Sequence, residues 1–115
     1  MKFMKFVGIV AALVFGLAAC GESEKSTAER IKDIVILSGD LTGGEAIFDS
    51  KCAFCHGASG EGKGESPAMA EAVNGQTDNH LIEVVIDGFG SMAGLGSSLS
   101  DQEIADVIVF AKTFE

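Results

Sequence analysis

Two cysteines and a histidine form the most chemically specific pattern in this sequence. Cys52, Cys55 and His56 lie in the order Cys-Ala-Phe-Cys-His. Two thiols three positions apart, on one helical turn, can each form a thioether to the two vinyl groups of one porphyrin edge, and the histidine that follows is carried under the iron. The motif therefore predicts one covalently attached haem c.

Two other uses of this motif are weaker. A zinc site needs four ligands, and after the leader the domain offers these two cysteines, the adjacent histidine and a distant His80. A redox-active dithiol is expected in a βαβ context, which the hydropathy pattern does not show. Haem attachment remains the interpretation that uses all three side chains.

The start of the chain has the pattern of an export signal. Lys2 and Lys5 precede an apolar run over 6–17, and Leu-Ala-Ala-Cys20 follows. This ending resembles the lipobox of bacterial lipoproteins, which implies that residues 1–19 are removed and that Cys20 carries a lipid. The alternative is ordinary secretion with Cys20 unmodified. Either way we expect export, and the lipobox implies the periplasmic or cell-surface face of a bacterial membrane.

Charge and composition narrow the function of the rest of the chain. From Cys20 onward there are six basic and 17 acidic side chains, which disfavours nucleic acid and favours partners with basic surfaces. The same part has no Trp, no Tyr and five Phe, a small supply of large side chains for a core. We therefore expect haem to fill the core and the haem-free chain to be largely unfolded.

The pattern of caps and apolar positions predicts an all-α fold of three to five short helices, with strand alternation nearly absent. Residues 21–30 are small and charged and are expected to form a linker, and 31–37 could be a strand or a helical turn. The haem domain is expected over 42–115. Its first predicted helix spans 43–52 and follows a capping box of Thr42 and Glu45. At most a short helix is expected in 67–73. A third should run from Thr77 or Asp78 to 86, and a last one from the capping box of Ser100 and Glu103 to about 114.

The loop over 57–64 resembles the first part of a phosphate-binding loop, Gly-x4-Gly-Lys. It does not fit, because Gly64 stands where a Ser or Thr must hold magnesium and no apolar strand leads into it. No Ser/His/Asp or paired-carboxylate arrangement can be assembled either. We therefore expect no enzymatic activity.

Residues 42–115 resemble a small class I cytochrome c. Gly44 and Phe48 match the glycine and aromatic with which the family's first helix crosses its last, here at Val107 and Phe110. Pro67 matches the proline whose carbonyl accepts a hydrogen bond from the ligand imidazole. The resemblance implies a monohaem fold in which that bond fixes the tautomer of His56.

The resemblance also implies Met92 as the second axial ligand. This residue lies in a glycine-flanked loop, which we expect to be flexible enough to bring the thioether to the iron; the alternative is a Met that packs without coordinating. The family has Pro after this Met, and here Ala93 follows. Met69 matches a position that packs on the porphyrin, and His80 is expected to be a solvated surface histidine.

His/Met ligation leaves no open iron position, so the predicted function is a monomeric single-electron carrier tethered by Cys20 to a membrane. Two alternatives stay open. If Met92 does not bind firmly, the haem could bind a gas as a sensor. The chain could also be a fixed haem subunit of a larger oxidase or reductase, docked through 31–37.

Overall fold

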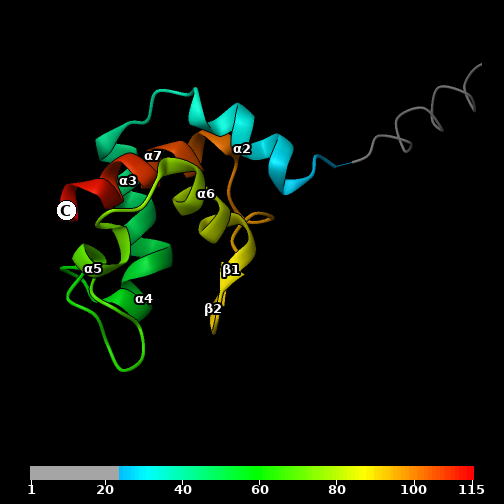
Figure 1. Ribbon diagram of the computed structural model, residues 1–115. Helices are drawn as coiled ribbons and strands as arrows, with labels where there is room; N and C mark the ends of the chain where they lie inside the picture. The colour runs from blue at the N-terminus through cyan, green and yellow to red at the C-terminus, as the bar shows by residue number, and fades with distance from the viewer. Residues whose placement is uncertain (1–23) are drawn as a thin grey trace, which may run out of the picture.

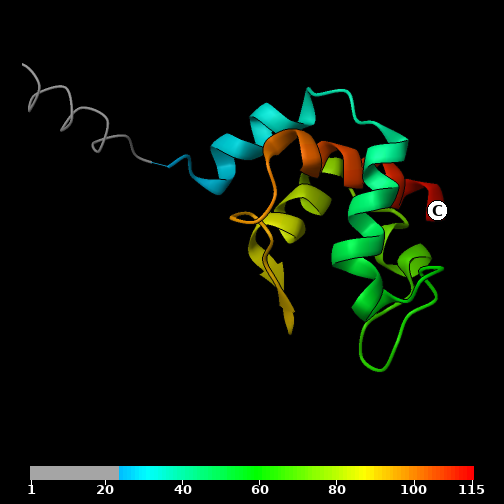
Figure 2. The same cartoon turned by 180° about the vertical axis from the view of Figure 1, so that it is seen from behind.

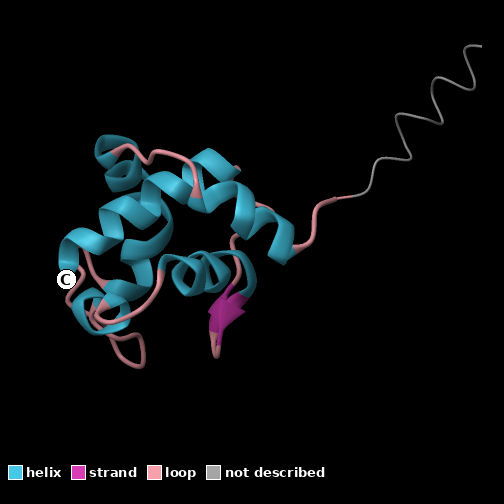
Figure 3. Cartoon of the chain, turned by 45° about the horizontal axis from the view of Figure 1, so that its top comes forward, coloured by secondary structure: helices cyan, strands magenta, loops and turns pink. Residues whose placement is uncertain are grey.

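Helices make up most of residues 24–115, the part of the chain that the computed structural model describes (Figure 1, Figure 3). In chain order the elements are α2 (Thr27–Val35), α3 (Leu41–Ile47), the π-helical turn η1 (Phe48–Cys52), α4 (Ala53–His56), α5 (Met69–Val73), α6 (Asp78–Asp87), β1 (Gly88–Phe89), β2 (Met92–Ala93), α7 (Asp101–Ala111) and the 3-10 turn η2 (Lys112–Phe114). The predicted all-α class is confirmed, with one short antiparallel pair added. The predicted signal and Cys20 lie outside the described residues.

The crossing of α3 with α7 organises the domain (Figure 2). A β carbon at Gly44 would lie 2.1 Å from the carbonyl oxygen of Asp106, so only glycine permits this approach. One turn later Phe48 is 1 % exposed and packs on Phe110, with 5.5 Å between ring centroids. Phe114 completes the cluster at 5.4 Å from Phe48. The predicted contact of Gly44 and Phe48 with the last helix is confirmed.

Two of the three predicted helix starts are confirmed. Ser100 forms a capping box with Glu103 at the start of α7, and the Thr77 hydroxyl accepts from the His80 amide at the start of α6. Gly88 then ends α6 with a positive φ of 86°. These starts are fixed by neighbouring residues, which is why the sequence pattern locates them.

The predicted start of α3 is wrong. The Asp40 carboxylate accepts from the Gly43 amide at 2.7 Å, so the helix begins at Leu41 and not after Thr42. The Asp40 amide itself donates to the Asp106 carboxylate of α7 at 2.8 Å. The residue that caps α3 is thus also bound to the last helix. The helix expected to end near Cys52 continues through η1 and α4 to His56.

The segment before the haem domain is also more ordered than expected. Ser26 and Glu29 form a capping box for α2, so Thr27–Arg30 are helical and the linker prediction is wrong for them. The ambiguous stretch 31–37 resolves as the last part of this helix and the turn after it. Ile34 buries the inner face of α2 at 2 % exposure. Within residues 24–115 no helix is long and apolar enough to cross a bilayer.

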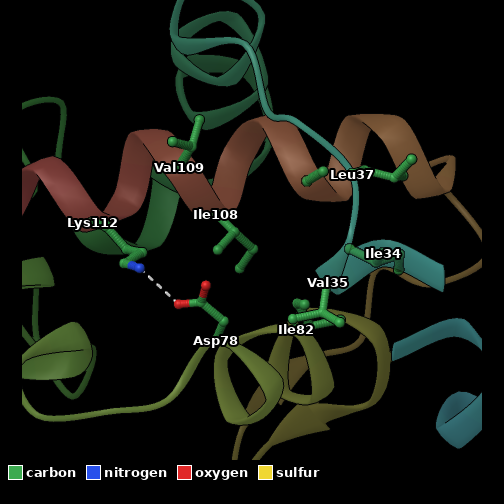
Figure 4. A pocket seen from close by; sticks show the side chains of 9 residues that line it. Ile34, Val35, Leu37, Asp78, Ile82, Ile108, Val109 and Lys112 are labelled. Atoms are coloured by element: carbon green, nitrogen blue, oxygen red, sulfur yellow. Dashed lines mark hydrogen bonds and ion pairs between the residues drawn. The ribbon is translucent and has the colours of Figure 1, made fainter. Parts of the chain in front are cut away.

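One continuous cluster of apolar side chains forms the core. Its buried members are Ile34, Phe48, Met69, Val73, Leu81, Ile82, Ile86, Leu99, Ile104, Ala105, Val107, Ile108 and Ala111. Between α2, α6 and α7 a small cavity of about 110 Å³ remains, with an ion pair from Lys112 to Asp78 at 2.7 Å on one side (Figure 4). Because α2 contributes Ile34 to the core, it is an integral part of the domain.

Candidate haem site

The predicted haem residues divide between two structural units at one end of the molecule. One unit is the end of η1 with α4 and the loop that follows it, and the other is the β1–β2 hairpin on the opposite side (Figure 1, Figure 2). The first holds Cys52, Cys55, His56 and Pro67, and the second holds Met92. We call them the histidine side and the methionine side.

On the histidine side, His56 is positioned by a hydrogen bond. Its Nδ1 lies 3.0 Å from the carbonyl oxygen of Pro67. Because a carbonyl oxygen only accepts, Nδ1 carries the proton and Nε2 keeps its lone pair. The predicted hydrogen bond between these two residues is therefore present, and the tautomer is the one that can bind a metal through Nε2.

The loop after His56 is closed by its own backbone. The Gly62 amide donates to the His56 carbonyl at 2.6 Å, and the Met69 amide donates to the Gly60 carbonyl at 2.8 Å. Gly62 has a φ of 90°, a conformation that side chains rarely adopt. Most residues that fix the histidine therefore lie within fifteen positions of it in the chain.

The Cys52 thiol lacks the lowered pKa that a redox-active dithiol requires. Cys52 is half-buried and Cys55 is exposed, and both are free. Burial, with a smaller effect of Cys55, raises the pKa of the Cys52 thiol to about 11. A redox-active dithiol depends on a lowered thiol pKa. In residues 24–115 no three His, Cys, Asp or Glu side chains are grouped as a metal site would require, so zinc has no ligand set there.

On the methionine side, the expected flexible loop is instead a hairpin. Phe89 pairs with Met92 and Gly88 with Ala93, leaving Gly90 and Ser91 as a two-residue turn. Gly90 has a φ of 59°, as a type II′ turn requires at its first position. Met92 therefore has a defined register without a proline after it. Strands of two residues are too short to give a visible alternation in the sequence.

The base of this hairpin packs tightly on the end of α6. The Leu95 amide donates to the Val85 carbonyl at 2.7 Å, and the Gly96 amide to the Ile86 carbonyl at 3.1 Å. A β carbon at Gly94 would lie 2.4 Å from the Ile86 carbonyl oxygen. The returning strand thus runs against backbone and has little room to shift.

Met69 and His80 differ in how they meet the predictions. Met69 is 8 % exposed and belongs to the core, as predicted, and a β carbon at Gly60 would lie 3.0 Å from its Cγ. His80 is half-buried in the first turn of α6, so the expectation of a solvated histidine is only partly met. Met69 ends the histidine-side loop, whereas His80 belongs to neither unit.

Phe89 was not predicted from the sequence. It pairs directly with Met92, and paired residues of an antiparallel ladder place their side chains on one face. Its side chain is 71 % exposed, unusually high for phenylalanine. The hairpin therefore presents an aromatic ring beside the thioether.

The residues present fit a haem with His/Met ligation. Two unpaired thiols lie one helical turn apart, His56 has a free Nε2, and a thioether with an aromatic neighbour lies on the opposite unit. This donor set of imidazole nitrogen, thioether sulfur and two thiols matches what haem c requires.

Known c-type cytochromes resemble this chain. The model of the family described as cytochrome C oxidase, cbb3-type, subunit III matches residues 39–110. The cytochrome c-553-like protein of Synechocystis sp. is 27 % identical over 106 residues, covering 92 % of this chain and 97 % of that protein. Cytochrome c6 of Diacronema lutheri is 31 % identical over 75 residues, covering 60 % of this chain and 89 % of that protein.

A solved cytochrome structure has a fold similar to that of this chain. The crystal structure of cytochrome cL from Hyphomicrobium denitrificans superposes with a TM-score of 0.56 at 30 % identity, covering 63 % of this chain and 45 % of that one. The chain therefore belongs to this cytochrome c family and is a class I c-type cytochrome. It binds one covalently attached haem c and carries single electrons between redox partners, with no substrate chemistry of its own. Membership in the family is consistent with export.

Proposed function

We propose that Cys52 and Cys55 hold the haem through thioethers and that His56 and Met92 are the axial ligands of its iron. The observation that carries this assignment is the 3.0 Å hydrogen bond from His56 Nδ1 to the Pro67 carbonyl. This bond holds the ring in one orientation and makes Nε2 more basic, as outer partners of metal-bound histidines do.

The surrounding residues limit the site to electron transfer. Haem with two strong protein ligands supplies a one-electron couple and has no open position for oxygen or substrate. Buried Met69 and the ring of Phe89 provide apolar surface on the two sides of the site. An apolar, six-coordinate site favours rapid outer-sphere exchange because little in it must rearrange.

We further propose that the mature protein begins at a lipid-modified Cys20 on the outer side of a bacterial membrane. Cys20 precedes Thr27, the start of α2, by seven positions, a reach of at most about 25 Å for an extended chain. The protein then moves close to one membrane surface. Replacing Cys20 with Ser should release it into the soluble exported fraction, and retention in the membrane fraction would contradict the anchor.

The partners we propose are redox proteins with basic docking surfaces, approached by a monomer. Six basic and 17 acidic side chains from Cys20 onward give a negative field that steers such encounters. Electron-transfer rates with a basic partner should fall as salt is raised. Rates that stay flat or rise would contradict the charge argument.

One absorption experiment tests the ligand assignment. Ferric haem with an iron–thioether bond has a weak far-red band, and its ferrous form binds CO slowly. We expect both properties in the holoprotein, and Met92→Ala should abolish the band and permit rapid CO binding. Met69→Ala is the matched control and should keep the band. A wild-type protein without the band would support the gas-binding alternative.

A fixed haem subunit is the second candidate, because the matching family carries the name of an oxidase subunit. Residues 31–37, the end of α2 and the turn after it, would be its docking face, with Ile36 at 81 % exposure. Co-purification of the chain with a larger complex from native membranes at moderate salt would favour this role over a mobile carrier.

A further inference from the structure

Helix α2 lies outside residues 39–110, the part that matches the family, yet it contacts both ends of the methionine hairpin. The Thr27 hydroxyl donates to the Asp87 carboxylate at 2.8 Å, and Asp87 directly precedes β1. Arg30 contacts the segment that leaves β2. This helix therefore connects the chain entering the hairpin with the chain leaving it.

Arg30 makes three hydrogen bonds to that leaving segment. Its Nη1 donates to the Gly96 carbonyl at 2.6 Å, its Nη2 to the Leu99 carbonyl at 3.1 Å, and its Nε to the Asp101 carboxylate at 2.8 Å. The Arg30 side chain is 18 % exposed and that of Asp101 31 %, so the contacts are shielded from solvent and salt. One planar guanidinium thus binds three positions of this stretch at once.

The position of these bonds matters for Met92. The segment from Gly94 to the start of α7 contains two glycines and three serines, which favour many conformations. Its first part hydrogen-bonds to the end of α6, and its second part is held by Arg30. Without the guanidinium, the Gly96 and Leu99 carbonyls lose partly buried donors, and beyond its bonds to α6 the connection from β2 to α7 loses its hydrogen bonds to α2.

We propose that Arg30 is a positioning residue for the methionine side. Through its bonds to Gly96, Leu99 and Asp101 it keeps Met92 at the iron. It thereby takes over the role of the proline that the family has after this methionine and that this chain lacks. The inference rests on the proposed ligation by Met92. It assigns to α2 a role in setting how much of the protein has an intact iron–thioether bond, in addition to burying apolar surface.

The test compares Arg30→Met with Lys112→Met in the full holoprotein. Arg30→Met keeps the aliphatic stem but removes the donors. Lys112→Met removes an ion pair of similar length, between the start of α6 and η2, that does not contact the hairpin or its connection to α7. The readouts are the far-red ferric band, the rate of CO binding to the ferrous protein, and the guanidinium unfolding midpoint.

We expect both variants to lower the unfolding midpoint. Only Arg30→Met should weaken the far-red band and accelerate CO binding. Because charge-assisted hydrogen bonds are lost, the rate of CO binding should rise on the order of tenfold. Arg30→Lys, which keeps the charge but not the planar fork, should recover part of the effect and remains testable if Arg30→Met does not fold. If the Arg30 variants kept the wild-type band and the wild-type rate of CO binding, the role of Arg30 would be overturned, while ligation by Met92 would stand. A wild-type holoprotein without the band would overturn the Met92 ligation and the inference together.

Discussion

The two sides of the haem site are built by different means. On the histidine side, the loop from His56 to Met69 closes through hydrogen bonds between residues close in sequence. On the methionine side, Met92 lies on a hairpin of two-residue strands whose base is held by α6 and by Arg30, which is 66 residues from Gly96 in the chain. The first ligand is therefore fixed locally, whereas the second depends on the assembled fold.

The largest expected effect comes from removing the group that both sides share. With Cys52→Ala and Cys55→Ala, haem cannot attach, and we expect a largely unfolded chain because the core has few large side chains. Far-ultraviolet circular dichroism measures this. Native helicity in the haem-free double variant would show that the protein core suffices and that the two sides assemble without haem.

An intermediate effect is expected from Gly94→Ala on the methionine side. The added carbon would lie 2.4 Å from the Ile86 carbonyl oxygen, so backbone must move, at a cost of about 1–3 kcal/mol. We expect a weaker far-red band and faster CO binding. The control is Gly64→Ala on the histidine side, where φ is 53° and no atom lies within 4 Å of the added carbon.

Gly64→Ala should cost about 1 kcal/mol through backbone strain alone and leave the band unchanged. Stability is measured by guanidinium unfolding and ligation by the band. If the two variants changed the band equally, the two sides would not be independent, and the contrast between local and long-range support would fail.

The smallest effect is expected at Glu61 in the histidine-side loop. Hydrogen bonds from its own amide and from the Ser59 amide lower the pKa of this carboxyl. Its contribution to stability is therefore present above the ordinary Glu pKa and is lost as pH falls through the lower, folded-state value. Glu61→Gln should be slightly less stable at neutral pH, and the difference should vanish in acid.

Unfolding midpoints of wild type and Glu61→Gln over a series of pH values test this sign. The far-red band should be the same in both proteins, because the loop does not hold Met92. A stability difference that stays constant into acid would mean that ionisation of Glu61 plays no part.

The same contrast explains which features the sequence predicts. The Cys52 to His56 motif, the Pro67 hydrogen bond and the Ser100 cap depend on short spacings or on a family pattern, and each is found in the structure. The Asp40 cap and the hairpin are also local, but Thr42 and Glu45 offer a competing cap pattern and two-residue strands show no alternation. The contacts of Arg30 instead join residues far apart in the chain. No local pattern encodes such contacts, so reasoning from neighbours misses them.

The crossing of α3 with α7 also determines at what stage of folding the helices can pack around the haem site. Gly44 and Phe48 find their partners on α7, which is synthesised well after them. Until that helix arrives, the segment with Cys52 and Cys55 has no packed neighbour, and contacts of such long sequence separation form slowly. The late closure leaves an interval in which the two thiols are accessible for covalent attachment, before Gly44 fits against Asp106 and encloses the finished centre.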